Sequence, residues 1–238
     1  MAEALREPTQ QLRLELLSIV KSLKSHVMNQ DKFAAGLKWK KVGQMENQIK
    51  NDASNIEHNL SNIYDNMANC QLCPLGKIRH NLVFGDGNPR AQIVFIGEAP
   101  GADEDEQGLP FVGRAGQLLT RIIEAMGLNR KDVYICNILK CRPPQNRNPL
   151  PEEILACEPF LKQQLKIISP RIICALGTFA AKTLLKTEAP ITALRGRFHS
   201  YNGIPLMPTY HPAYLLRNPS AKKLVWDDVQ LIMKELQT

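Results

Sequence analysis

The sequence lacks any long hydrophobic run. No stretch of its 238 residues approaches the roughly 20 consecutive apolar residues that a membrane-spanning helix needs. It also lacks an export signal, because Glu3, Arg6 and Glu7 precede a first helical pattern that is not purely apolar. These absences argue against a membrane protein and against a secreted one. We therefore expect a soluble protein of the cytoplasm.

Cysteine is sparse, and acidic residues are outnumbered by basic ones. Six cysteines without an export signal argue against a disulfide framework and favour metal or cluster ligation, or simple burial. The chain has 30 Lys and Arg against 23 Asp and Glu, a net charge of +7. Residues 1–65 hold nine basic and eight acidic residues, so residues 66–238 hold 21 against 15. A phosphate-backbone partner would favour this excess, although many basic domains never contact nucleic acid.

The length and the polar pattern indicate one main domain with an extension. At 238 residues the chain exceeds the usual single domain of about 100–200 residues. Residues 9–28 place leucines and isoleucines at helical spacing, whereas residues 31–65 are polar and predict a weaker helix and a linker. We interpret residues 1–65 as a helical extension that is either a solvated appendage or a docking element for a protein partner. Residues 66–238 form the main domain.

The main domain alternates short apolar runs with helical segments. The runs are rich in β-branched residues, as buried parallel strands are, and lie at residues 92–96, 133–138, 171–176 and 204–207. Helical patterns follow at residues 115–126, 151–168, 179–185 and 221–236. The alternation predicts an α/β fold with an open four-stranded parallel sheet covered by helices on both faces.

Polar residues follow the carboxyl ends of the predicted strands, where ligands bind in such sheets. Glu98 follows the first strand and Asn137 lies at the end of the second. Gly177 and Thr178 follow the third strand, and His211 follows the fourth. Each alone could be a capping, turn or surface residue. Their shared placement predicts one site at this rim.

Four of the cysteines form a candidate ligand set: Cys70, Cys73, Cys141 and Cys157. The close pair is the stronger signal, because two intervening residues let both sulfurs turn toward one centre. Four thiolates can hold either zinc or a cubane iron–sulfur cluster. Cys136 and Cys174 fall within predicted strands and are interpreted as small buried side chains.

Three motifs in order resemble the signatures of the family 4 uracil-DNA glycosylases. They are GEAPGADED continuing to GLPFVG over residues 97–113, NILKCRPP over 137–144 and HPAY over 211–214. The resemblance covers about residues 66–236. It implies a catalytic domain that hydrolyses the N-glycosidic bond of uracil in single- and double-stranded DNA, the first step of base excision repair. The cysteine spacing is also similar to that family's and implies a [4Fe–4S] cluster.

The resemblance implies a role for each rim residue. Uracil in a duplex must be flipped into a pocket, where Phe111 would stack on it and Ala99 would line the site. Asn137 would read the O4 and N3–H edge. His211 would hydrogen-bond O2 as charge builds on the departing base. Glu98 would act as general base or only orient the water, and bulk near C5 from Glu104 or its neighbours would exclude thymine.

The DNA-contacting residues are expected around the same rim. Gly177 and Thr178 begin a helix there. Leu215 and Leu216 follow His211, and we expect one to enter the vacated base stack while the other is core. Arg217 would hold a phosphate. The expected partner is uracil-containing DNA, bound by a monomer, with the protein at the nucleoid if the cell is bacterial.

Three alternatives can be weighed from the sequence. A relative that captures uracil-DNA covalently needs a histidine in an inserted loop, and residues 141–149 contain none. A catalytically inactive iron–sulfur DNA-binding module, associated with replication or repair machinery through residues 1–65, is the second. The presence of Glu98, Asn137 and His211 together argues against it. A zinc deaminase would need His-x-Glu followed by Pro-Cys-x-x-Cys, which is absent.

Overall fold

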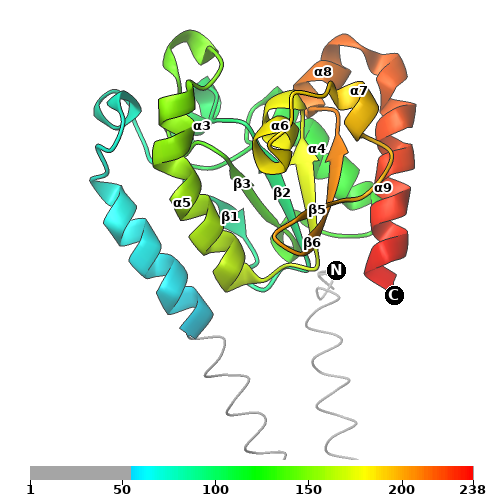
Figure 1. The fold of residues 1–238 in the computed structure, drawn as a ribbon, viewed down its shortest axis with the longest axis horizontal. Coiled ribbons are helices and arrows are strands. Elements are labelled where there is room, and N and C mark those ends of the chain that lie inside the picture. Colours follow the sequence, from blue (N-terminus) through cyan, green and yellow to red (C-terminus); the bar gives the residue numbers. More distant parts are fainter. Residues whose placement is uncertain (1–54, 238) are drawn as a thin grey trace, which may run out of the picture. The chain divides into compact units, whose positions relative to one another are not determined.

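The computed structural model describes residues 55–237 (Figure 1). The helix expected at residues 9–28, and most of the polar segment at 31–65, lie outside the described residues. The first described segment is a helix that covers residues 55–68. Leu60, Ile63 and Met67 on one face of it are buried in the same core as the sheet. The expected boundary between residues 65 and 66 falls within this helix, which belongs to the same compact unit as the rest of the described chain.

Within the described residues, six strands form one sheet in the order β1-β3-β2-β4-β6-β5. Their bounds are β1 Asp86–Gly87, β2 Ile93–Gly97, β3 Tyr134–Asn137, β4 Ile172–Leu176, β5 His199–Tyr201 and β6 Ile204–Thr209. The four inner strands, β3, β2, β4 and β6, are parallel, which confirms the predicted four-stranded core. The edge strands β1 and β5 pair antiparallel to it and were not predicted.

Helices connect and cover these strands. They are η1 Pro74–Lys77, α3 Ala102–Gln107, α4 Arg114–Ala125, η2 Arg130–Asp132, η3 Pro144–Asn146, α5 Pro151–Ile168, α6 Thr178–Leu185, α7 Ile191–Leu194, α8 Pro212–Arg217, η4 Pro219–Ala221 and α9 Lys222–Gln237. The helices predicted between strands and at the chain end correspond to α4, α5, α6 and α9. Among the described residues, no helix combines the length and the apolar character that crossing a membrane requires.

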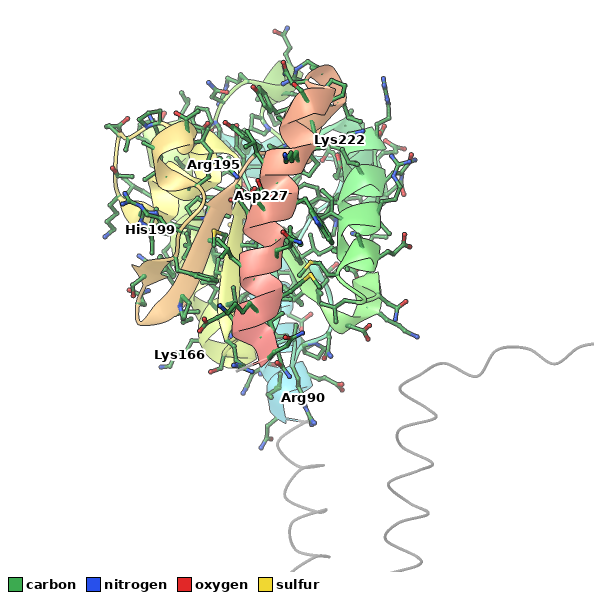
Figure 2. The ribbon with its side chains drawn as sticks, turned by 90° about the vertical axis from the view of Figure 1, so that its right-hand side faces the viewer. Arg90, Lys166, Arg195, His199, Lys222 and Asp227 are labelled. Carbon is green, nitrogen blue, oxygen red and sulfur yellow. The ribbon has the colours of Figure 1, made fainter. Side chains whose placement is uncertain are left out.

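The sheet buries side chains on both faces, as the continuous apolar runs predict. Along β2, Val94 and Ile96 pack into the cluster formed with α5, α6 and the helix of residues 55–68. Ile93 and Phe95 point the other way and pack with α4 and α9. Figure 1 shows α5 and α6 in front of the sheet, and Figure 2 shows α9 and α4 side by side on the opposite face. The two helical layers leave the carboxyl rim of the strands available for a site.

Candidate functional site

The parallel strands bring the predicted polar residues to one edge of the sheet. Glu98 follows β2, Asn137 is the last residue of β3, and Gly177 follows β4 directly. His211 lies two residues beyond β6. The backbone bonds Ile138 N–H to Gly97 O and Leu139 N–H to Glu98 O, both 3.0 Å, continue the β2–β3 pairing past the strand ends. The backbone that carries Glu98 is thereby fixed against the backbone that follows Asn137.

Gly97 is the point where two predicted base-binding residues meet. A Cβ at this position would lie 2.3 Å from Asn137 Oδ1 and 2.5 Å from Phe111 Cζ. Any side chain at Gly97 would therefore occupy the space that Asn137 and Phe111 now share. The amide of Asn137 and the ring of Phe111 line the same small space at the end of β2.

Asn137 is a buried amide with an unused acceptor. Its residue is 2% exposed, and within residues 55–237 its Oδ1 has no hydrogen-bond partner. A buried polar atom without a partner costs about 1–3 kcal/mol, so such atoms call for an explanation. A ligand that donates an N–H to Oδ1 would remove this cost.

Phe111 is held in a left-handed backbone conformation, with φ of 53°. A Cβ on Gly116, in the first turn of α4, would lie 1.9 Å from Phe111 O, so the loop packs tightly against that helix. The ring of Phe111 is buried, and its centroid lies 5.5 Å from that of His211. The loop thus presents the aromatic ring toward the histidine.

Glu104 and Arg130 hold the Phe111 loop from both sides. Glu104 Oε1 accepts from Val112 N–H at 2.9 Å and from Gly113 N–H at 3.0 Å, while Oε2 accepts from Gly101 N–H at 3.1 Å. Arg130 donates to Phe111 O at 3.1 Å and to the neighbouring Pro110 O. Both oxygens of Glu104 are therefore engaged by backbone. Glu104 lies at the third position of α3, where a capping carboxylate is expected. The role of Arg130 was not predicted from the sequence.

His211 is oriented by its own helix. It is the N-cap of α8, and its Nδ1 accepts from Ala213 N–H at 3.1 Å. Burial, followed by the positive charge of Arg217, lowers the pKa of His211 to about 4. Near neutral pH the imidazole is uncharged with its proton on Nε2, which makes Nε2 a hydrogen-bond donor. A Cβ on Gly177, whose φ is 92°, would lie 2.9 Å from His211 Cβ, so glycine permits this close approach.

Asp228, a buried carboxylate on α9, fixes the end of β6 on the face of the sheet that α9 covers. Thr209 donates to Asp228 Oδ2 at 2.6 Å, and Arg195 donates to Asp228 Oδ1 at 2.8 Å. Figure 2 shows Arg195 beside α9. Since Thr209 is two residues from His211, this network holds the strand end that carries the histidine.

Glu98 is half-buried beside these groups. Burial raises the pKa of its carboxyl group to about 7. Ala99, the next residue, is also half-buried. A carboxyl group that titrates near neutral pH at a strand end is a typical general base or water-orienting group.

The residues after His211 divide between core and surface. Leu215 is 1% exposed and packs in the cluster with α4 and α9, whereas Leu216 is half-buried and Arg217 is exposed. Of the two leucines, Leu215 is the core residue.

Tyr214 was not predicted as a site residue, yet it is 38% exposed and stacks on Tyr210 with centroids 4.9 Å apart. After β4, the strand next to β6, Thr178 is half-buried at the start of α6.

A second constellation lies away from these rim residues. One cavity is lined by all four candidate ligands: Cys70, Cys73, Cys141 and Cys157. Arg79 also lines it and donates from Nη1 to Cys141 Sγ at 3.2 Å. Burial raises the pKa of Cys157 to about 11 and also raises that of Cys141. The other two cysteines, Cys136 and Cys174, are buried within β3 and β4, as predicted.

The four candidate thiols line one cavity, and four thiolates are the ligand set that a cubane iron–sulfur cluster requires. In the described part of the chain, no three His, Cys, Asp or Glu side chains gather closely enough to hold a single metal ion. In a cubane cluster each thiolate binds a different iron, so the ligands are spread more widely than around one zinc. Four cysteines around one cavity fit such a cluster.

An open α/β sheet with convergent polar groups at its carboxyl rim defines a ligand-binding protein of the doubly wound class. The family model of the "Uracil DNA glycosylase superfamily" matches residues 84–230. A type-4 uracil-DNA glycosylase of Saccharolobus solfataricus is 47% identical over 189 residues, which cover 76% of this chain and 88% of the relative. The chain belongs to the uracil-DNA glycosylase superfamily and, within it, to the type-4 family.

Two further relatives carry the same name. The type-4 uracil-DNA glycosylase of Thermotoga maritima is 46% identical over 172 residues, covering 71% of this chain and 90% of the relative. That of Archaeoglobus fulgidus is 42% identical over 181 residues, covering 73% and 91%. The similarity therefore extends over nearly the full length of these relatives.

Proposed function

We propose that this protein is a uracil-DNA glycosylase that hydrolyses the N-glycosidic bond between uracil and deoxyribose in single- and double-stranded DNA. This is the first step of base excision repair. The observation that carries the proposal is the buried, unpaired Oδ1 of Asn137 beside Phe111, close to a neutral histidine. The names of the type-4 relatives support it, and they disfavour a catalytically inactive DNA-binding module.

Asn137 reads the flipped base in this proposal. Its Oδ1 accepts from uracil N3–H, and its amide N–H donates to O4. Cytosine presents an acceptor at N3 and a donor at N4, so it would leave polar groups unpaired in a buried site. Such mismatches can discriminate by as much as about four to five powers of ten. Phe111 supplies the stacking face, and Ala99 lines the site beside Glu98.

His211 and Glu98 act on the charges that develop as the bond breaks. Nε2–H of the neutral imidazole donates to uracil O2, which gains negative charge in the transition state. The Glu98 carboxylate orients the attacking water and offsets the positive charge that develops on the sugar. Its pKa of about 7 suits a group that interacts with the water proton near neutral pH.

Cys70, Cys73, Cys141 and Cys157 would hold a [4Fe–4S] cluster. When bound, the cluster would supply a rigid cross-link between the segments that carry these cysteines. This role is structural, since hydrolysis of the N-glycosidic bond requires no electron transfer. The cysteines join the loop before η1 to the exit of β3 and to α5. Arg79 contributes a hydrogen bond to Cys141 Sγ and two to the helix carbonyls Met67 O and Ala68 O.

The remaining assignments concern partners. Gly177, Thr178, Leu216 and Arg217 contact uracil-containing DNA around the rim. Leu215, the other leucine predicted to contact DNA, supports them from the core. We propose that the protein acts as a monomer and that residues 1–65 dock a protein partner. A DNA substrate would place it in the cytoplasm, at the nucleoid if the cell is bacterial.

A strand-cleavage assay tests the function. The protein is incubated with labelled oligonucleotides that carry one uracil, single-stranded or paired with guanine, and then with alkali to cut abasic sites. Cleavage at the uracil position alone is expected, with the matched cytosine and thymine oligonucleotides as controls. Binding of both uracil substrates without base release would contradict the proposal and support the inactive module.

A further inference from the structure

Lys140 is a fully buried cation. It is 0% exposed, and within residues 55–237 its Nζ meets no oxygen or nitrogen acceptor and interacts directly only with the buried thiol of Cys136. Burying an ammonium group costs several kcal/mol unless a counter-charge or hydrogen-bond acceptors compensate it. The site described so far gives this side chain no role, although it lies three residues from Asn137 and directly before Cys141.

The buried carboxylates of the described residues serve other partners. Glu153 is paired with Arg147, and Asp228 is paired with Arg195. Asp105 Oδ1 accepts from the backbone N–H groups of His80 and Asn81. Each of these three carboxylates is bound by partners other than Lys140. The counter-charge of Lys140 therefore comes from another group.

The groups near Lys140 are sulfur atoms. Burial raises the pKa of Cys157, and both the charge of Lys140 and its backbone N–H act on that thiol in the opposite direction. The same charge, together with a hydrogen bond from the Lys140 side chain, acts on the thiol of Cys136 in the same direction. The carbonyl oxygen of Lys140 accepts from Val83 N–H at 2.9 Å, which fixes the backbone at this point. Lys140 is therefore buried next to Cys141 in the chain, with its backbone N–H bonded to the Cys157 thiol and its charge acting on that candidate ligand.

We propose that Lys140 is the buried counter-charge of the iron–sulfur cluster. The inference rests on the cluster assigned under the proposed function. Four thiolates outweigh the positive charge of an oxidised cubane core, so the bound group is an anion as a whole. An ammonium beside the Cys157 ligand offsets this charge where no solvent can, and the anion in turn compensates the burial of Lys140.

Arg79 and Lys140 differ in how strongly their charges act. Arg79 is half-buried and donates to two backbone carbonyls as well as to Cys141. Solvent screens part of its charge. Lys140 is shielded from solvent, so its charge acts at a lower effective dielectric constant. Net charge and hydrogen bonds to sulfur set the reduction potential of such clusters, and removing Lys140 should therefore change it more than removing an exposed lysine nearby.

The test measures the cluster directly. Wild type, Lys140→Met, Lys140→Gln and Lys140→Arg are purified anaerobically. Lys77→Met is the matched control, because Lys77 is an exposed lysine of η1. Iron and sulfide per chain are determined, and the midpoint potential is measured by protein-film voltammetry. Loss of a positive charge favours the oxidised form. Lys140→Met and Lys140→Gln should raise the ratio of oxidised to reduced cluster at fixed potential at least tenfold, about 59 mV for one electron. Lys140→Arg and Lys77→Met should change the ratio less than about twofold, because the first keeps the buried charge and the second removes a screened one.

The outcomes separate the two proposals. Wild type without iron would contradict the cluster itself. Wild type with iron, and Lys140→Met or Lys140→Gln with an unchanged potential, would overturn the role of Lys140 and leave the cluster in place. If the neutral variants do not retain a cluster, the potential cannot be measured, and the iron content of the variants then tests the role of Lys140. Retention in Lys140→Arg with loss in Lys140→Gln supports the counter-charge, and equal loss in both overturns it.

Discussion

The ring of Phe111 lies with its centroid 5.5 Å from the imidazole centroid of His211, at an interplanar angle of 33°. One residue comes from the loop before α4 and the other from the N-terminus of α8, a hundred positions later in the chain. Their proximity joins the aromatic face of the site to its hydrogen-bond donor. A planar base that stacks on Phe111 would therefore present one edge toward the imidazole of His211.

The pH dependence of base release should follow Glu98. Its raised pKa, about 7, means that the carboxylate needed for the reaction forms as pH rises through that value. His211 has a lowered pKa, about 4, so it stays neutral over this range. Single-turnover rates should rise about tenfold per pH unit below 7 and level off above it. Glu98→Gln should be slow and flat across the range, and a falling rate between pH 6 and 8 would contradict the assignment.

His211→Ala should slow uracil release by about a hundredfold to a thousandfold, because one hydrogen-bond donor to the developing charge is lost. The affinity for DNA that contains uracil should change by much less, since this donor matters mainly in the transition state. Single-turnover kinetics and fluorescence anisotropy measure the two effects separately. A near wild-type rate would remove His211 from the mechanism.

Gly97→Ala tests whether the space beside Asn137 and Phe111 is the base pocket. The added Cβ would lie under 3 Å from atoms of both residues, so one of them must move. We expect uracil release to fall at least a hundredfold while the midpoint of thermal unfolding shifts by only a few degrees. Gly127→Asn is the control, because no atom lies within 4 Å of its added Cβ and asparagine tolerates its positive φ of 77°. Full activity in Gly97→Ala would place the base elsewhere.

The parts that the sequence predicted well are those that the hydrophobic pattern determines. The inner strands are buried apolar runs and the helices between them are amphipathic, so both follow from the sequence, and the order of the strands brought Glu98, Asn137 and His211 to one rim. The edge strand β5 was missed, although Asn202 and Gly203, both with positive φ, form the two-residue hairpin loop that joins it to β6.

Other features depend on contacts that no local pattern carries. β1 consists of two residues, too few for any periodicity to mark it as a strand. Arg130 reaches the backbone of the Phe111 loop across about twenty positions of sequence, and its spacing gives no sign of this contact. Adjacent leucines 215 and 216 are equally apolar, and only packing against α4 and α9 shows that Leu215 is the core residue.

The final prediction concerns how a base leaves the duplex. Leu216 lies five residues after His211, is half-buried, and is followed by the exposed Arg217. An apolar side chain at the mouth of the pocket can fill the vacated place in the stack, an advantage that matters only where neighbouring bases are stacked and paired. Leu216→Ala should therefore slow excision from duplex DNA at least fivefold more than excision from single strands.

Leu215→Ala is the matched control for Leu216→Ala. Because Leu215 is 1% exposed, its truncation should lower the free energy of unfolding by about 2–5 kcal/mol and affect both substrates alike wherever the protein stays folded. Urea denaturation and parallel single-turnover assays on the two substrates measure these effects. Equal losses on duplex and single-stranded uracil in Leu216→Ala, with unaltered unfolding, would rule out Leu216 as the wedge. The exposed ring of Tyr214, stacked on Tyr210 just before α8, would then be the next side chain to test.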